Sequence, residues 1–140
     1  MSHLKSLVKK TDVVTLPPSA TVLEASKKMA EHLIGSVIVL EGDRPLGIFT
    51  ERDLLNRVVA KGLDPQKTPL SQVMSQGLKT VSVHETVEAC FKKMEETKCR
   101  HIPIEEDGRL VGVVTMRNIL EWLTDQIKEE NLFLKNYIQS

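Results

Sequence analysis

The stretch Gly47-Ile-Phe-Thr50-Glu-Arg-Asp53 recurs as Gly112-Val-Val-Thr115-Met-Arg-Asn118, 65 residues further along the chain. In both places two apolar residues of high β-propensity precede a threonine, and threonine is a good helix N-cap. The pattern therefore predicts a strand that passes directly into a helix, twice, at one fixed separation.

This recurrence belongs to a longer internal repeat. With a shift of 65 residues, Thr15–Leu55 aligns with Thr80–Leu120 without a gap, and 13 of the 41 aligned pairs are identical. Average composition alone gives about two or three identities over that length. The period is too long for a short solenoid unit, so each repeat is expected to be a supersecondary unit of its own.

Both repeats predict the same order of elements, β-α-β-β-α. In the first, Thr21 caps a helix with Val22, Ala25, Met29 and Leu33 on its apolar face, and Gly35 ends it. The other elements of that repeat are strands at 13–16, 37–40 and 46–49 and a helix at about 51–60. The second repeat gives strands at 79–83, 102–104 and 110–114 and helices that start near Thr86 and Met116, and a short helix at 71–74 lies between the repeats.

The predicted fold class is α/β, of the α+β kind, with two β-α-β-β-α repeats related by a pseudo-twofold axis. A hairpin with two helices leaves one apolar sheet face open, so the two sheets are expected to pack face to face. We divide the chain into a first repeat with its N-terminal linker at 1–64, a second repeat at 65–130 and a C-terminal helical tail at 131–140. The tail is too apolar for a disordered end, and we expect it to dock on its own chain or on a partner subunit.

Composition restricts the class of protein. The 140 residues carry 19 Lys and Arg against 19 Asp and Glu, and a net charge of zero argues against a general nucleic-acid binder. No apolar run approaches the roughly 18 residues that span a bilayer, and the N-terminus shows no signal-peptide pattern. Cys90 and Cys99 match no metal or redox spacing and are predicted to be free thiols, so we expect a cytoplasmic protein that does not associate with a membrane.

These motifs resemble the cystathionine-β-synthase (CBS) domain family, and their arrangement resembles the stand-alone tandem pair called a Bateman module. Both copies follow the family's glycine, two apolar residues, Thr or Ser, two spacers and then Asp, except that the second copy ends in Asn118. Arg100-His-Ile-Pro103-Ile is similar to the basic–apolar–Pro segment that opens the family's second strand. The resemblance covers about residues 6–128 and implies ligand binding in the cleft between the repeats.

The resemblance implies a primary site that joins the helix start of the first repeat to the strand start of the second. Its residues are Thr50, Arg52, Asp53, Thr80, Arg100, His101, Ile102 and Pro103. A helix start suits phosphate, the Asp53 carboxylate can accept both hydroxyls of a ribose, and Arg100 can donate to phosphate oxygens. His101 adds a donor, and the apolar edge at Ile102 covers an adenine. The alternatives are that Thr50 and Asp53 only cap the helix, that Arg100 is a solvated charge and that His101 is a packing residue.

A secondary, pseudo-symmetric site consists of Thr15, Ser36, Ile38, Thr115, Arg117 and Asn118. Asn118 replaces the Asp of the motif and Gly35-Ser36 replaces Arg100-His101, so the charged acceptor and the basic pair are both missing. Hydrogen bonds to charged groups contribute about 1.5–3 kcal/mol against about 1 kcal/mol for neutral ones. We therefore expect this site to bind nucleotide weakly, to be empty or to take a different ligand. Arg52 and Arg117 either reach phosphates or lie on the helix surface.

The predicted function is a non-catalytic regulatory module that binds AMP, ADP or ATP. The sequence has no glycine-rich phosphate loop, no cluster of metal-ligating residues, and no Cys or Ser in a recognisable nucleophile motif. These features argue against an enzyme, a metal site and a catalytic cofactor. Two alternatives stay open, an S-adenosylmethionine or NAD-type ligand and a ligand-free dimerisation module. The resemblance also implies a twofold homodimer formed through helices. Little sequence lies outside the repeats, so we expect the effector on another polypeptide.

Overall fold

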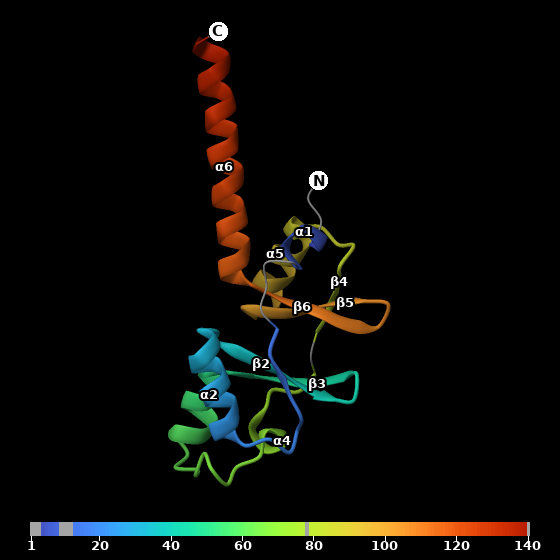
Figure 1. Cartoon of the computed structure of the whole chain (residues 1–140), viewed down its shortest axis with the longest axis vertical. Helices are drawn as coiled ribbons and strands as arrows, with labels where there is room; N and C mark the ends of the chain where they lie inside the picture. Colours follow the sequence, from blue (N-terminus) through green and yellow to red (C-terminus); the bar gives the residue numbers. More distant parts are fainter. Residues whose placement is uncertain (1–3, 9–12, 78, 140) are drawn as a thin grey trace.

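In the computed structural model the two repeats form two halves that face one another, and the predicted order of elements is confirmed (Figure 1). The structure describes residues 4–8, 13–77 and 79–139. Each half holds a three-stranded sheet, ordered β1-β2-β3 in the first repeat and β4-β5-β6 in the second. The first pair of strands in each sheet is parallel and the second pair is an antiparallel hairpin.

The first half consists of β1 (Thr15–Leu16), α2 (Val22–His32), β2 (Ser36–Glu41), β3 (Arg44–Thr50), α3 (Glu51–Asp53) and η1 (Leu54–Val59). The Thr21 hydroxyl accepts from the Glu24 backbone N–H at 3.2 Å and so caps α2 as predicted. The residue that ends α2 is Leu33 and not Gly35, because Leu33 takes the left-handed conformation, with φ 54°, that turns the chain out of the helix. The segment predicted as one helix at 51–60 starts as α3 and continues with π-helical hydrogen bonding as η1.

The second half consists of β4 (Val81–Ser82), α5 (Val87–Thr97), β5 (His101–Glu106), β6 (Arg109–Thr115) and α6 (Met116–Gln139). Asp107 and Gly108 both have positive φ, 53° and 79°, which is the two-residue turn that the Asp-Gly pair predicts for the β5–β6 hairpin. Helix α6 runs without a break through the segment predicted as a separate tail and projects away from both halves (Figure 1). Cys90 is buried, Cys99 is exposed, and both are free thiols as predicted.

Two short helices each pack against the half to which the predicted boundary does not assign them. Helix α4 (Leu70–Val73) lies between the repeats in sequence, yet Leu70 and Val73 belong to the core of the first half. Helix α1 (Lys5–Val8) precedes the first repeat, yet Leu4 and Leu7 are buried in the core of the second half. A boundary at residue 64 therefore separates each of these helices from the core that it completes.

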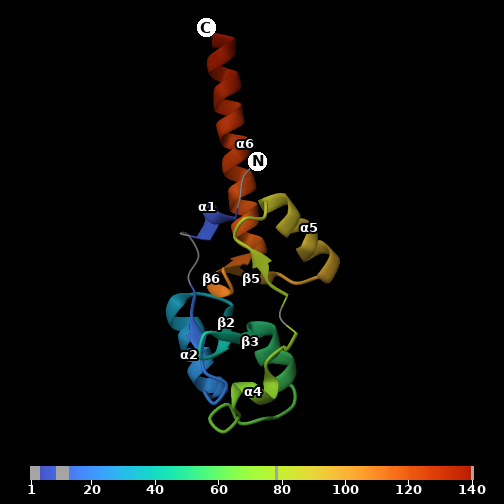
Figure 2. The ribbon, with the colours of Figure 1, turned by 90° about the vertical axis from the view of Figure 1, so that its right-hand side faces the viewer.

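The two sheets pack face to face, as the open apolar faces predict (Figure 2). The contact between them is a cluster of Ile38, Ile48 and Val113, with Leu40 and Leu110 packed against it. These residues point to the sheet faces opposite the helices, so burying them closes both halves around one shared layer. No described helix is both long and apolar enough to cross a membrane.

Candidate functional site

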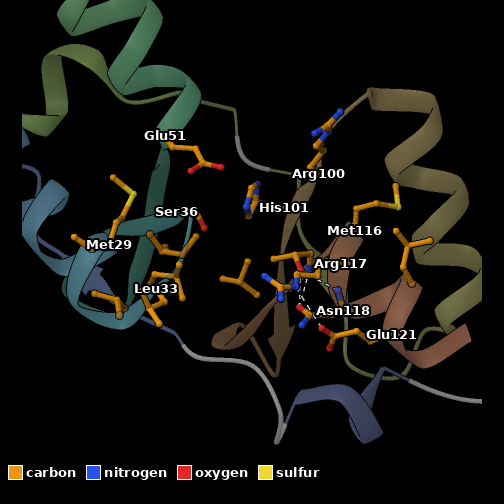
Figure 3. Close-up of a pocket in the computed structure, with 18 residues that line it drawn as sticks. Met29, Leu33, Ser36, Glu51, Arg100, His101, Met116, Arg117, Asn118 and Glu121 are labelled. Carbon is orange, nitrogen blue, oxygen red and sulfur yellow. Dashed lines mark hydrogen bonds and ion pairs between the residues drawn. The ribbon is translucent and has the colours of Figure 1, made fainter. Parts of the chain in front are cut away.

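A cavity of about 1050 Å³ lies between the two halves (Figure 3). It is formed by the end of α2, the start of β2, the start of β5 and the first turns of α6. Ligand pockets in proteins measure about 300–1,000 Å³, so the cavity has the size of a small-molecule site.

The structure divides the predicted site residues into two groups. The cavity is lined by Ser36, Ile38, Arg100, His101, Thr115, Arg117 and Asn118. Its lining does not include Thr15, Thr50, Arg52, Asp53, Thr80, Ile102 or Pro103. The basic pair that the resemblance assigns to the Asp53 site therefore lies in the same cavity as Thr115 and Asn118.

The pseudo-symmetry of the repeats explains this arrangement. In the first repeat the Glu51 N–H at the start of α3 donates to the Gly35 carbonyl at 3.0 Å. In the second the Met116 N–H at the start of α6 donates to the Arg100 carbonyl at 2.9 Å. Equivalent strand starts and helix starts of both repeats thus reach the cavity, but their side chains differ.

Thr115 and Asn118 form a closed hydrogen-bond network at the start of α6. The Asn118 side-chain Oδ1 accepts from the Thr115 N–H and hydroxyl, both at 2.9 Å, and the Asn118 N–H donates to the Thr115 hydroxyl at 3.0 Å. Because Oδ1 faces a backbone N–H, the Nδ2 amide is the free end of the side chain. No described residue forms a hydrogen bond with Nδ2, so it is available as a donor to a ligand in the cavity.

Thr50 and Asp53 repeat this network in the first half, with a charged acceptor. The Asp53 carboxylate accepts from the Thr50 N–H at 3.0 Å, and the Asp53 N–H donates to the Thr50 hydroxyl at 3.1 Å. The Ser75 hydroxyl also donates to the carboxylate, at 3.1 and 3.2 Å, and Arg57 Nε lies 3.6 Å from it. Asp53 is buried, with partners on most sides of its carboxylate.

The cavity carries both signs of charge. Arg100 and Arg117 supply cations, and Glu51 and Glu121 supply carboxylates. Arg117 Nε lies 3.3 Å from Glu121 Oε1, and both side chains are largely exposed. Such a surface pair contributes little to stability, so Arg117 can turn toward an anionic ligand at small cost.

His101 lies on the cavity wall across from Glu51 (Figure 3). Burial lowers the pKa of its imidazole, the Glu51 carboxylate opposes that effect, and Arg100 adds to it. The imidazole is therefore mostly neutral at pH 7 in the ligand-free protein. Gly35 packs beneath this pair, since a Cβ at residue 35 would stand 3.1 Å from Glu51 Oε1 and 3.6 Å from His101 Nε2.

The other predicted residues have structural surroundings. Ile102 is in the core of the second half, and Pro103 is buried in β5 opposite Val113. Thr15 pairs with Ile38 in the sheet, and the Thr80 carbonyl accepts from Lys93 Nζ at 3.2 Å. Arg52 is exposed on α3.

Sequence reasoning did not identify Glu51 or Leu33 as cavity residues. Glu51 occupies a spacer position of its motif and Leu33 belongs to the apolar pattern of α2, so neither has a distinguishing signal in the sequence. For Glu51, the only indication of a cavity position is that it is equivalent to Met116 in the second repeat, which also lines the cavity. Within the described ranges, His, Cys, Asp and Glu side chains form no group of three that could hold a metal ion.

The chain is similar to proteins of known sequence and to solved structures. The chain is 41% identical over 128 residues to a protein of Methanopyrus kandleri, matching 88% of this chain and 65% of that relative's length. It is 34% identical over 119 residues to the CBS domain-containing protein YhcV of Bacillus subtilis, matching 85% of this chain and 84% of the relative. A CBS domain protein from Pyrobaculum aerophilum, solved in complex with AMP, superimposes with a TM-score of 0.76 at 28% identity, covering 88% of this chain and 98% of that one.

The family model for the CBS domain matches residues 4–60 and again residues 70–125. These two matches follow the internal repeat and the two halves of the structure. The chain belongs to the CBS domain family and contains a tandem pair of CBS domains.

Proposed function

We propose that the chain is a non-catalytic regulatory module that binds an adenine nucleotide in the cavity between its two CBS domains. The observation that carries the proposal is the cavity itself, which gathers Arg100, His101, Arg117 and Asn118 beside an apolar wall. The AMP complex of the Pyrobaculum aerophilum protein supports the class of ligand.

The cavity has a suitable surface for each part of a nucleotide. Val14, Met29, Ile38 and Val113 form an apolar wall that suits the adenine ring. Asn118 Nδ2 and the Thr115 hydroxyl lie at the start of α6 and suit the ribose hydroxyls. Arg100 and Arg117 suit the phosphate, because a guanidinium donates two hydrogen bonds to it at once.

The structure favours the Asn118 side over the Asp53 side for the nucleotide. A ribose at Asp53 would have to displace the Ser75 hydroxyl from a carboxylate that is already buried. The Asn118 amide keeps a free donor and faces the cavity. We therefore place the first bound nucleotide at Thr115 and Asn118, with Arg100 as its main charged contact.

Calorimetric titration with AMP tests the proposal. Arg100→Gln is expected to weaken AMP binding about 10- to 100-fold, since a hydrogen bond to a charged group is worth about 1.5–3 kcal/mol. Arg109→Gln, which removes an exposed arginine at the β5–β6 turn, is the matched control and is expected to change nothing. Adenosine has no phosphate, so both variants should bind it like the wild type. Equal loss of AMP in the two variants, or no binding to the wild type, contradicts the proposal.

The same titration decides between the two sides of the cleft. Asn118→Ala is expected to reduce AMP binding, whereas Asp53→Asn keeps the shape of its side chain and is expected to leave it within about twofold. The reverse result would assign the nucleotide to the Asp53 side.

One observation favours a second candidate, an adenosyl ligand with an amino group such as S-adenosylmethionine. The Glu51 carboxylate lies in the cavity across from His101 and suits an ammonium group better than a phosphate (Figure 3). If S-adenosylmethionine binds more tightly than AMP and Glu51→Gln removes that preference, this candidate replaces the first. If no adenosyl compound raises the melting temperature, a ligand-free dimerisation module remains.

A further inference from the structure

Helix α6 leaves the protein body after its first two turns. Ile119 is buried, and Trp122 packs against the core of the second half. From Thr124 to Ile138 every residue is exposed, and the helix extends away from both halves (Figures 1 and 2). With a rise of about 1.5 Å per residue, this exposed segment is about 22 Å long.

One face of the projecting helix is apolar. Leu120, Leu123, Ile127, Leu134 and Ile138 recur at spacings of three, four or seven residues, which brings them to one side of α6. We call these five residues the α6 seam. Their exposed fractions are 53, 38, 58, 49 and 79%. The opposite side carries Glu121, Asp125, Lys128, Glu129 and Lys135.

Such a helix needs a partner. Helices of about 15 residues that pack on nothing are marginal in water, and most helical stability comes from the burial of an apolar face. A continuous exposed apolar stripe flanked by charges marks an interaction surface. Leu120, Leu123, Ile127 and Leu134 have the spacing of the a and d positions of a coiled coil, which pack against another helix of the same kind, and Ile138 follows at the adjacent e position.

We propose that the α6 seam pairs with the α6 seam of a second molecule of this chain, with the two helices antiparallel. Apolar residues of the seam lie on both sides of Glu130, so two copies can cover one another about a twofold axis. Covering the seams of two molecules buries on the order of 500 Å² of aliphatic surface. Phe133, 69% exposed beside the seam, adds on the order of 200 Å² from the two molecules. With the polar flanks the pair reaches about 1,000 Å², the size of a specific interface.

Glu130 decides the orientation. It occupies the d position between Ile127 and Leu134, so a parallel pair in register would place two Glu130 carboxylates against each other. An antiparallel pair that sets Leu123 opposite Leu134 of the second molecule places Glu130 opposite Ile127 instead. It also aligns the helix dipoles in opposite directions, which is the favourable arrangement.

Sedimentation velocity of the full chain over a range of concentrations tests the pairing. Ile127→Gln combined with Leu134→Gln is expected to lower the association state and raise the dissociation constant at least tenfold. Leu132→Gln makes the same chemical change on the polar side of the same helix, where Leu132 is also exposed, and should associate like the wild type. An unchanged association state in the double variant, or a wild type that stays monomeric at about 100 μM, overturns the proposal. Ligand titration is not involved, so failure here is distinct from failure of nucleotide binding.

Spin labels test the orientation. In a Cys99→Ser background, labels at Lys128→Cys are expected to be close together, because residue 128 lies near the twofold axis of the antiparallel pair. Labels at Asn136→Cys are expected to be separated by about 22 Å along the helix axis, since residue 136 faces residue 121 of the second molecule. Short distances at both positions would show a parallel pair and refute the antiparallel arrangement.

Discussion

Replacing Gly47 with alanine is expected to destabilise the first half through a steric clash with the linker. A Cβ at residue 47 would stand 2.6 Å from the Ser75 carbonyl oxygen and 2.9 Å from Met74 Sδ. Met74 Sδ can move, but the Ser75 carbonyl is backbone. It accepts from the Ile48 N–H at 3.0 Å, and the Ser75 N–H donates to the Ile48 carbonyl at 2.8 Å. The alanine therefore forces the linker away from β3.

The magnitude follows from these contacts. Overpacking a close contact costs about 1–3 kcal/mol. Weakening the two backbone hydrogen bonds adds about 0.5–1.5 kcal/mol for each bond that is lost. We expect the free energy of unfolding to fall by about 2–4 kcal/mol, which for a chain of this size lowers the melting temperature by roughly 8–15 °C.

Urea unfolding monitored by circular dichroism measures the loss, and Gly62→Ala is the matched control. Gly62 has φ +71° and open space around its Cβ position, so alanine there carries only left-handed backbone strain, about 1 kcal/mol. Gly47 has no left-handed φ, so its cost is steric alone. If Gly47→Ala unfolds within about 0.5 kcal/mol of the wild type, the close approach of the linker is not a structural requirement and the reasoning is wrong.

Three further predictions follow from single contacts. Asp53→Ala should lower the free energy of unfolding, measured in urea, by about 2–3 kcal/mol, because the Thr50 N–H and the Ser75 hydroxyl lose their acceptor. Asp53→Asn should retain most of the stability, since the Asn118 side chain accepts from the Thr115 N–H in the equivalent position. Equal losses in the two variants would refute the acceptor role. Burial lowers the pKa of His101 below its ordinary 6.5, so the unfolded chain binds a proton at this residue before the folded protein does as the pH falls. The free energy of unfolding should therefore decline below about pH 6.5 in the wild type, and His101→Gln should lack this part of the decline. Parallel pH profiles of the two proteins would contradict the prediction. Burial raises the pKa of the Cys90 thiol to about 11, so a thiol reagent at pH 8 should modify Cys99 alone in the folded protein and both cysteines in urea; rapid reaction of two thiols in the folded protein would show that Cys90 is accessible.

The duplication and the fold could be predicted from the sequence because they depend on local patterns. Thr21 and Thr86 cap helices in both repeats, and the Asp107-Gly108 turn closes its hairpin. The sheet-to-sheet contact also follows from alternation, since Ile38 and Ile48 fall on the face away from the helices. These features need only neighbours in the chain or along one strand.

The sequence could not predict which half α1 and α4 pack against, because that depends on the three-dimensional packing of the two cores. Leu4 directly precedes α1 and Leu70 opens α4; both are apolar, and nothing local assigns either to the first or the second half. The end of α2 also differs from the sequence prediction. Glycine is the usual residue for a left-handed position, but Leu33 takes this conformation at the end of α2, and Lys98 takes it at the equivalent end of α5.

The sequence motifs alone do not show how charge is distributed in the cavity, because each motif indicates only one side of the cleft. Counting Gly35-Ser36 as a replacement for Arg100-His101 removes the basic pair from the Asn118 side. In the structure the strand starts of both repeats reach one cavity, so a single basic pair serves it from the second repeat. Residues from both repeats line the same cavity, and only the packing of the two halves shows which of them come together.

Charged side chains reach the cavity from both repeats. Arg100 and His101 come from β5 in the second repeat, whereas Glu51, equivalent to Met116, comes from α3 in the first. In the proposed binding mode an anionic ligand held by Arg100 lies in the same cavity as the Glu51 carboxylate, and a proton on His101 would reduce the repulsion between them. Bound phosphate raises the pKa of His101, so protonation and ligand binding reinforce each other, and AMP should bind more tightly at pH 6 than at pH 8. Because Arg100 and Glu51 belong to different repeats, a nucleotide bound as proposed would have different affinities for different relative positions of the two halves. Such differential affinity for two arrangements is what a regulatory ligand requires.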